Sequence, residues 1–218
     1  MSVSENLKKL KDSIPSHVTL IAVSKTHPVE AISEAYNSGH KIFGENKVQE
    51  MADKCEQLPK DIEWHLIGHL QTNKVKYIAP FVHLIHSVDS LKLLQEINKQ
   101  AAKNNRVINC LLQIYIAKEE TKFGLSFEEA EQLINLTELK KPQNVKIVGL
   151  MGMATNTDNA EQIRNEFRSL KLFFNKLKIQ NSELKILSMG MSSDYKIAIE
   201  EGSNMIRLGS IIFGERNY

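Results

Sequence analysis

The chain has 218 residues, of which 42% are hydrophobic and 25% charged, and these proportions are ordinary for a globular protein. They exclude a disordered, collagen-like or membrane-spanning chain. The 28 lysines and arginines nearly balance the 26 acidic residues, giving a net charge of +2, so we expect no general attraction to nucleic acid or anionic lipid. Cys55 and Cys110 fit no disulfide or zinc pattern, and residues 1–20 lack the apolar run of a signal peptide. We therefore expect a cytoplasmic protein with no membrane segment and no bound metal.

Short apolar runs alternate with longer amphipathic stretches along the chain. After a helix at about residues 4–13, strands are predicted at residues 19–24, 41–44, 62–67, 83–87, 107–116, 145–150, 185–188 and 205–208. Each strand is followed by a helix, at about residues 29–37, 46–57, 72 onward, 91–103, 126–139, 159–178, 193–200 and 210–213. Ser126 is predicted to cap its helix, because Glu128 and Glu129 in the first turn complement the helix dipole.

The strands are continuously apolar, which is typical of parallel sheets covered on both faces. Eight strand–helix units predict an α/β fold of the closed (β/α)8 type, a TIM barrel, preceded by an N-terminal helix. The main alternative is an open doubly wound sheet, but no G-x-G-x-x-G motif follows the first strand. No linker or low-complexity tract divides the chain, so we expect one domain over residues 1–218.

The carboxyl ends of the strands carry the active site in such barrels. Lys25 directly follows the first strand, which would place its amine at the barrel mouth. A desolvated lysine there has a lowered pKa and can form a Schiff base with a carbonyl compound. The alternative interpretation is a surface lysine, because lysines are abundant in this chain.

Glycines and serines follow the seventh and eighth strands, in residues 188–194 and 207–210. Glycine lets the backbone approach a phosphate, serine donates a hydrogen bond, and the short helices that follow add partial positive charge. Phosphate sites in these barrels often lie after strands seven and eight. An ordinary turn with a helix cap is the alternative for each segment alone, but the pair favours a phosphate site.

Other polar residues at strand ends remain open to two interpretations. Arg207 lies in an apolar strand and needs a partner there, either a ligand or a structural ion pair inside the barrel. Asn46 could cap a helix or contact a ligand. The pairs His65/His69 and His83/His86 have spacings seen in metal sites, but residues at these spacings on a strand stand too far apart for one ion. We expect them to form hydrogen bonds at the barrel mouth.

Seven segments together resemble the YggS/PROSC family of pyridoxal 5′-phosphate (PLP) homeostasis proteins. They are IAVSKTHPVE, FGENKVQE, WHLIGHLQTNK, HSVDS, KFGL, GLMGMAT and LSMGMSSDYKIAIEEGSNMIRLGSIIFGER. The segments span nearly the whole chain in the family's order and spacing, without a departure from its pattern.

The resemblance implies the single-domain barrel of fold-type III PLP proteins, related to the N-terminal domain of alanine racemase. It implies that PLP is held as a Schiff base on Lys25, that Arg207 faces the pyridine nitrogen, and that Asn46 is near the cofactor. The phosphate would lie against Ser192, Ser193, Gly209 and Ser210. The family binds, buffers and delivers PLP, so PLP-dependent apoenzymes are the expected partners. From the residues alone, a sugar-phosphate aldolase would fit equally well.

The resemblance favours a PLP carrier over an enzyme, with a PLP-dependent amino-acid racemase of low activity as the alternative. A racemase needs proton-transfer groups on both faces of its substrate, and in alanine racemase the second is a tyrosine from another domain of the partner subunit. The chain ends at Tyr218, so we expect no such domain, and a monomer. None of the tyrosines follows an obvious strand end. Arg207 would leave the pyridine nitrogen unprotonated, which weakens the ring as an electron sink.

Overall fold

The computed structural model describes residues 2–118, 123–136 and 144–214. The strands are β1 (Thr19–Val23), β2 (Ile42–Glu45), β3 (Glu63–Leu66), β4 (Leu84–Val88), β5 (Ile108–Ile114), β6 (Val145–Gly152), β7 (Ile186–Ser188) and β8 (Met205–Leu208). The helices are α1 (Val3–Ser13), α2 (Val29–Asn37), α3 (Val48–Gln57), α4 (Val75–Ile78), α5 (Leu91–Lys103), α6 (Phe127–Asn135), α7 (Ala160–Gln180), α8 (Tyr195–Glu200) and α9 (Ser210–Phe213), with a 3-10 turn at Thr72–Lys74.

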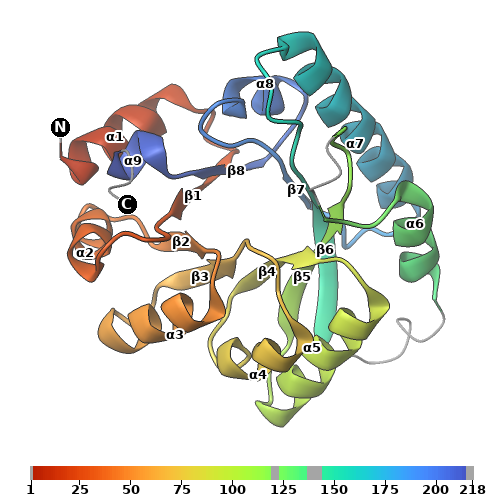
Figure 1. The fold of residues 1–218 in the computed structure, drawn as a ribbon, viewed down its shortest axis with the longest axis horizontal. Coiled ribbons are helices and arrows are strands. Elements are labelled where there is room, and N and C mark those ends of the chain that lie inside the picture. The colour runs from red at the N-terminus through yellow and green to blue at the C-terminus, as the bar shows by residue number, and fades with distance from the viewer. Residues whose placement is uncertain (1, 119–122, 137–143, 215–218) are drawn as a thin grey trace.

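All eight strands are parallel, and each pairs with its neighbours in sequence. β8 closes the ring by pairing with β1, where Ile21 lies opposite Arg207 and Ala22 opposite Leu208. The helices surround this ring, as Figure 1 shows, and α1 lies beside α9. The amide of Asn6 on α1 donates to the carbonyl of Ile212 on α9 at 3.0 Å. This contact ties the two ends of the described chain together.

The apolar side chains form two layers, one outside the strands and one within the ring. The outer layer packs the strands against the helices and includes the buried rings of Trp64, Phe43 and Phe167. The inner layer contains Ile21, Leu84, Leu111, Met151 and Met205. The sheet is therefore covered on both faces, which explains why the strands are rich in buried residues and do not alternate with exposed polar ones.

The barrel confirms the predicted fold class and N-terminal helix, and the predicted and observed strands agree within a few residues. Ser126 accepts from the Glu129 amide at 3.1 Å in a full capping box, as predicted. The predicted end of this helix, near residue 139, lies outside the described residues. The prediction that Asn46 caps a helix is wrong: α3 begins at Val48 with Lys47 in the cap position and no side-chain cap bond.

Among the described helices, none combines the length and apolar character needed to cross a membrane.

Candidate functional site

Neighbouring strands bring most of the predicted cofactor residues to one part of the barrel mouth. Lys25 follows β1, and Gly209 follows β8, which pairs with β1. A Cβ atom added to Gly209 would lie 3.1 Å from the Val23 carbonyl oxygen, so the two strand ends touch. Asn46 follows β2, which flanks β1 on its other side. The strand order β7, β8, β1, β2 therefore assembles these residues.

Lys25 lies at the start of a tight turn and is half-buried. The next residue, Thr26, has a φ of +67°, a conformation that β-branched residues rarely adopt. The turn is closed by the amide of His27, which donates to the Ser24 carbonyl at 3.1 Å. The backbone at Lys25 is thus folded back on itself at the mouth.

A cluster of buried and partly buried polar groups adjoins this turn, and we call it the mouth cluster: Ser24, Glu45, Glu50 and Lys54. The ammonium of Lys54 on α3 lies 2.8 Å from a Glu45 carboxylate oxygen and 2.7 Å from one of Glu50. It also donates to the Ser24 carbonyl at 2.8 Å. Burial raises the pKa of Glu45, while Lys54 and the Ser24 hydroxyl oppose that shift.

A second polar group runs through the barrel interior, and we call it the interior chain: His65, His86, Ser188 and Arg207. Arg207 donates to the Ser188 hydroxyl oxygen at 2.6 Å and to the Gly152 carbonyl at 3.2 Å. Ser188 Oγ lies 3.2 Å from Nδ1 of His86, whose Nε2 lies 3.1 Å from Nδ1 of His65. Since guanidinium only donates, the hydrogen bonds can all run from Arg207 toward His65.

Burial keeps the histidines of this chain neutral. It lowers the pKa of His65 to about 3 and that of His86 well below its usual value. Burial also lowers the pKa of Arg207 to about 10, which still leaves the guanidinium charged at neutral pH. Arg207 forms no ion pair with a carboxylate in the described part of the chain, although the charge of Asp194 acts to raise its pKa. The structural ion pair considered for Arg207 is therefore absent among these residues.

The loops after β7 and β8 contact each other. The Gly209 amide donates to Ser192 Oγ at 3.4 Å, and the Met191 amide donates to the Asp194 carboxylate at 2.6 Å. Gly190 has a φ of +96°, where a side chain would be strained. Ser193 and Ser210 are exposed. Because α8 has six residues and α9 four, backbone amides and hydroxyls, rather than long helix dipoles, are the available anion donors.

His65 and His86 form hydrogen bonds, as expected, but inside the barrel and not at its mouth, whereas His69 and His83 contact carboxylates. His65 and His86 lie within β3 and β4, so their side chains point into the barrel. Of the predicted pairs, only His69 lies beyond a strand end, where its ring is 3.3 Å from the Asp89 carboxylate.

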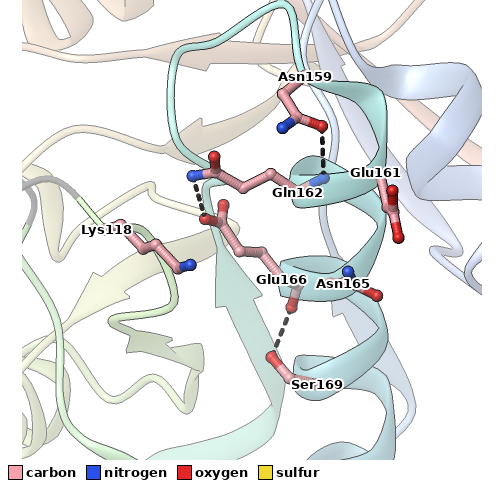
Figure 2. Close-up of a pocket in the computed structure, with 7 residues that line it drawn as sticks. All are labelled: Lys118, Asn159, Glu161, Gln162, Asn165, Glu166 and Ser169. Atoms are coloured by element: carbon pink, nitrogen blue, oxygen red, sulfur yellow. Dashed lines mark hydrogen bonds between the residues drawn. The ribbon is translucent and has the colours of Figure 1, made fainter.

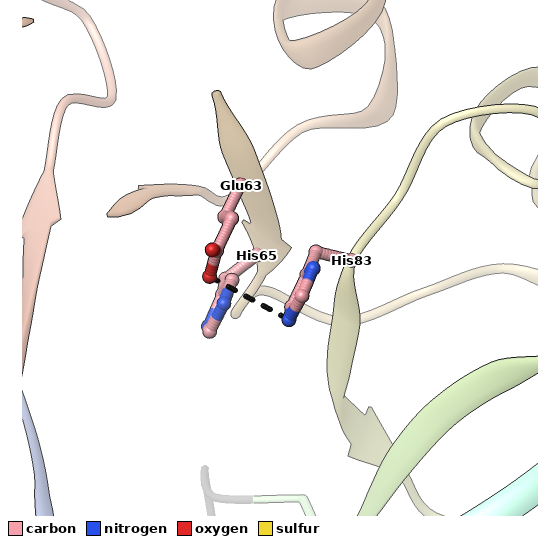
Figure 3. A group of neighbouring side chains, drawn as sticks. All are labelled: Glu63, His65 and His83. Carbon is pink, nitrogen blue, oxygen red and sulfur yellow. Dashed lines mark ion pairs between the residues drawn. The ribbon is translucent and has the colours of Figure 1, made fainter. Parts of the chain in front are cut away.

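Glu63, His65 and His83 bring possible metal ligands within 4.8 Å of one another. The spacing of histidines within one segment could not reveal this group, because it spans β3 and the residue before β4. Figure 3 shows the two imidazole rings side by side, and their planes are parallel to within 1° at a centroid distance of 5.5 Å. Ring-nitrogen lone pairs lie in the ring plane, so they do not converge on one ion here.

A separate polar pocket of about 390 Å³ lies along the start of α7, opposite Lys118 (Figure 2). The buried carboxylate of Glu166 accepts from the Thr155 amide at 2.7 Å, the Thr155 hydroxyl at 2.8 Å and Gln162 at 3.0 Å. No residue predicted to bind the cofactor lines this pocket.

Comparison with known proteins gives consistent matches over the whole chain. The family model of the alanine racemase N-terminal domain matches residues 2–217. The pyridoxal phosphate homeostasis protein of Aquifex aeolicus is 47% identical over 201 residues, covering 91% of this chain and 87% of that protein. The protein of the same name from Escherichia coli K12 is 34% identical, covering 99% of this chain and 97% of its own length.

Solved structures agree with these matches. PipY of Synechococcus elongatus superposes with a TM-score of 0.91 at 38% identity in a structure without PLP, covering 98% of this chain and all (100%) of that one. A second PipY structure, with PLP bound, has a TM-score of 0.88 at 36% identity and the same coverage of 98% and 100%. Alanine racemase of Clostridium difficile shares the fold at 15% identity, with a TM-score of 0.78 over 100% of this chain and 57% of its own.

Proposed function

The chain belongs to the family of the alanine racemase N-terminal domain and, within it, to the pyridoxal phosphate homeostasis proteins, and from this premise we propose that it binds PLP through Lys25 and serves to buffer and deliver it. PipY, at 36% identity, has been solved with PLP bound. A cytoplasmic location, a monomeric state and PLP-dependent apoenzymes as recipients remain predictions from the sequence.

One observation in this structure carries the proposal. The pairing of β8 with β1 on one side and β7 on the other brings a lysine, a buried arginine of β8 and two glycine–serine loops together. PLP presents an aldehyde, a ring nitrogen and a phosphate, and these three residue types meet those three groups. A cofactor without an aldehyde, a ring nitrogen or a phosphate would leave the lysine, the arginine or the loops without a matching group to bind.

The residues present fit the group. Hydrogen bonds to Ser188 and Gly152 engage the two terminal nitrogens of Arg207. A guanidinium has five N–H groups, so Arg207 retains donors for an acceptor such as a pyridine nitrogen. A Cβ atom at position 209 would crowd Val23, and the positive φ at position 190 would strain a side chain. Both positions therefore favour glycine, which leaves the loop backbone without a Cβ atom at these points. Serine hydroxyls at 192, 193 and 210 add donors for a phosphate.

When bound, PLP supplies an aldehyde that condenses with amines and a ring that withdraws electrons. Lys25 provides the amine and fixes the cofactor at the mouth. Arg207, held by Ser188 and Gly152, presents only N–H donors and so keeps a ring nitrogen facing it unprotonated. The loop amides and hydroxyls orient the phosphate, and Asn46 borders the site from β2. Each of these residues binds or orients, and a neutral ring nitrogen suits storage better than turnover.

A carrier without catalysis is part of the proposal. One structural difference bears on it: β5 ends at Ile114, so Tyr115 is the first residue beyond a strand end, whereas the sequence suggested no such tyrosine. Tyr115 is 37% exposed. Racemisation of L-amino acids by the PLP-loaded protein, lost in Tyr115→Phe, would assign it a catalytic role instead. We expect no racemisation in either protein.

The proposal is tested by titrating the purified protein with PLP and following the visible absorbance of the bound cofactor. The native protein should show saturable binding that borohydride reduction makes irreversible. Lys25→Ala should lose the reducible fraction while keeping its fold. Lys47→Ala is the matched control, since Lys47 is an exposed lysine after the neighbouring strand β2. Loss of binding in the control and not in Lys25→Ala would contradict the assignment.

A further inference from the structure

We propose that the mouth cluster is a positioning device for Lys25: Glu45, Glu50 and Lys54 clamp the backbone on both sides of that lysine and hold the strained turn that presents it. This inference rests on the proposed function in so far as it takes Lys25 to be the attachment point for PLP. The contacts that carry it are a property of the chain without any ligand.

The residue before Lys25 is held through two of its groups. The Ser24 hydroxyl donates to Glu45 at 2.7 Å, and the Ser24 carbonyl accepts from the Lys54 ammonium at 2.8 Å. Both partners are almost fully buried, with side-chain exposures of 0% for Glu45 and 7% for Lys54. Hydrogen bonds to buried charged groups are stronger and more directional than those at the surface.

The residue after Lys25 is held by the same cluster. The Thr26 amide donates to Oε1 of Glu50 at 2.5 Å, and that same oxygen accepts from Lys54 at 2.7 Å. Thr26 is the residue with a φ of +67°, and a strained backbone persists only where surrounding contacts over-determine it. The Glu50 carboxylate supplies that contact, and Lys54 holds Glu50 in place.

Lys54 links the two sides. Its ammonium has three N–H donors, and they meet three acceptors, on Ser24, Glu45 and Glu50. Lys54 is thereby committed and does not compete with Lys25 for an aldehyde. One carboxylate oxygen of the cluster is unsatisfied: Oε2 of Glu45 is buried with no hydrogen-bond partner among the described residues. Replacing a buried ion-pair cluster with well-packed apolar side chains is often neutral or stabilising, so the presence of this cluster beside Lys25 favours a positioning role.

The test uses Glu50, the most exposed carboxylate of the cluster, and starts with the protein free of PLP. Glu50→Ala removes the acceptor of the Thr26 amide, so hydrogen exchange at that amide should accelerate about tenfold or more, while exchange in β5 stays unchanged. Glu50→Gln keeps an acceptor oxygen and should restore most of the protection. Glu131→Ala is the matched control: Glu131 is also a partly exposed helical glutamate, paired with Lys176 at 2.7 Å.

The same variants are then titrated with PLP. Glu50→Ala should bind PLP about tenfold more weakly, with Glu50→Gln between it and the native protein, because a free turn must be ordered on attachment. Unchanged Thr26 exchange, unchanged PLP affinity, or an equal loss in Glu131→Ala would each overturn the positioning role. If Glu50→Ala does not fold, Glu50→Asp retracts the acceptor while keeping the charge and gives the same measurements. If the native protein binds no PLP at Lys25, the proposed function fails, while the exchange data still test the clamp.

Discussion

The mouth cluster and the interior chain, the two buried polar groups near β1, differ in the groups that surround their cation. In the mouth cluster, the ammonium of Lys54 is in direct ion-pair contact with two carboxylates. In the interior chain, the guanidinium of Arg207 hydrogen-bonds to a hydroxyl and a carbonyl, with neutral histidines beyond them. A cation paired with carboxylates is suited to holding the backbone, whereas a cation that hydrogen-bonds only to neutral groups keeps donors for a ligand. This difference supports the proposal that the mouth cluster shapes the site and that the interior chain contacts its occupant.

The variant with the largest expected effect removes the cation of the mouth cluster. Lys54→Met leaves the buried Glu45 carboxylate without its ion pair, and breaking a buried pair in this way costs about 3–5 kcal/mol of unfolding free energy. The loss is measured by chemical denaturation of the PLP-free protein.

A double variant is the control for that result. Adding Glu45→Gln to Lys54→Met removes the stranded charge, so much of the lost stability should return. A double variant no more stable than the single one would show that the two charges do not balance each other.

Removing the cation of the interior chain should have a smaller effect. Arg207→Met breaks no ion pair among the described residues, although the favourable interaction with the Asp194 charge is lost. The Ser188 hydroxyl and the Gly152 carbonyl lose a donor, while the cost of burying the guanidinium disappears. We expect a change of less than about 2 kcal/mol in the stability of the PLP-free protein. Denaturation of this variant beside Lys54→Met decides the point, and an equal or larger loss would mean that Arg207 is mainly structural.

The neutral histidines predict a pH dependence. In the unfolded chain a histidine has a pKa near 6.5, whereas burial lowers that of His65 to about 3. Below pH 6.5 the unfolded chain therefore binds more protons, and stability falls as the pH decreases toward the folded-state value. At pH 5.5 this amounts to about 1.4 kcal/mol for each such histidine.

The measurement is the unfolding free energy of the native protein and His65→Gln between pH 7.5 and 5. The variant should lose less stability over this range. The exposed His17 provides the control, and His17→Gln should follow the native curve. Parallel curves for the native protein and His65→Gln would contradict the assignment of a neutral interior.

The smallest effect is expected outside both groups, in the loops after β7 and β8. Ser192→Ala or Ser210→Ala removes one hydroxyl donor to a charged phosphate, which corresponds to about tenfold weaker binding of PLP. Pyridoxal, which lacks the phosphate, should bind as before. Equal losses for both ligands in a binding titration would place these serines at the mouth without a phosphate contact.

The sequence was a good guide to the residues at strand ends and a poor one to contacts between strands. Lys25 could be singled out because a charge ends a continuously apolar run, and the serine loops because glycine and serine follow two such runs. The contact between His86 and Ser188 joins residues 102 positions apart, and no local pattern encodes it. Lys54 looked like any helical surface lysine, because its spacing from Glu50 reveals a possible ion pair but not burial.

The most direct test of the account is to locate the bound cofactor. The native protein is loaded with PLP, reduced with borohydride and digested, and the labelled peptide is identified by mass spectrometry. The account predicts one predominant label, on Lys25. A predominant label on Lys47, Lys54 or any other lysine would contradict it.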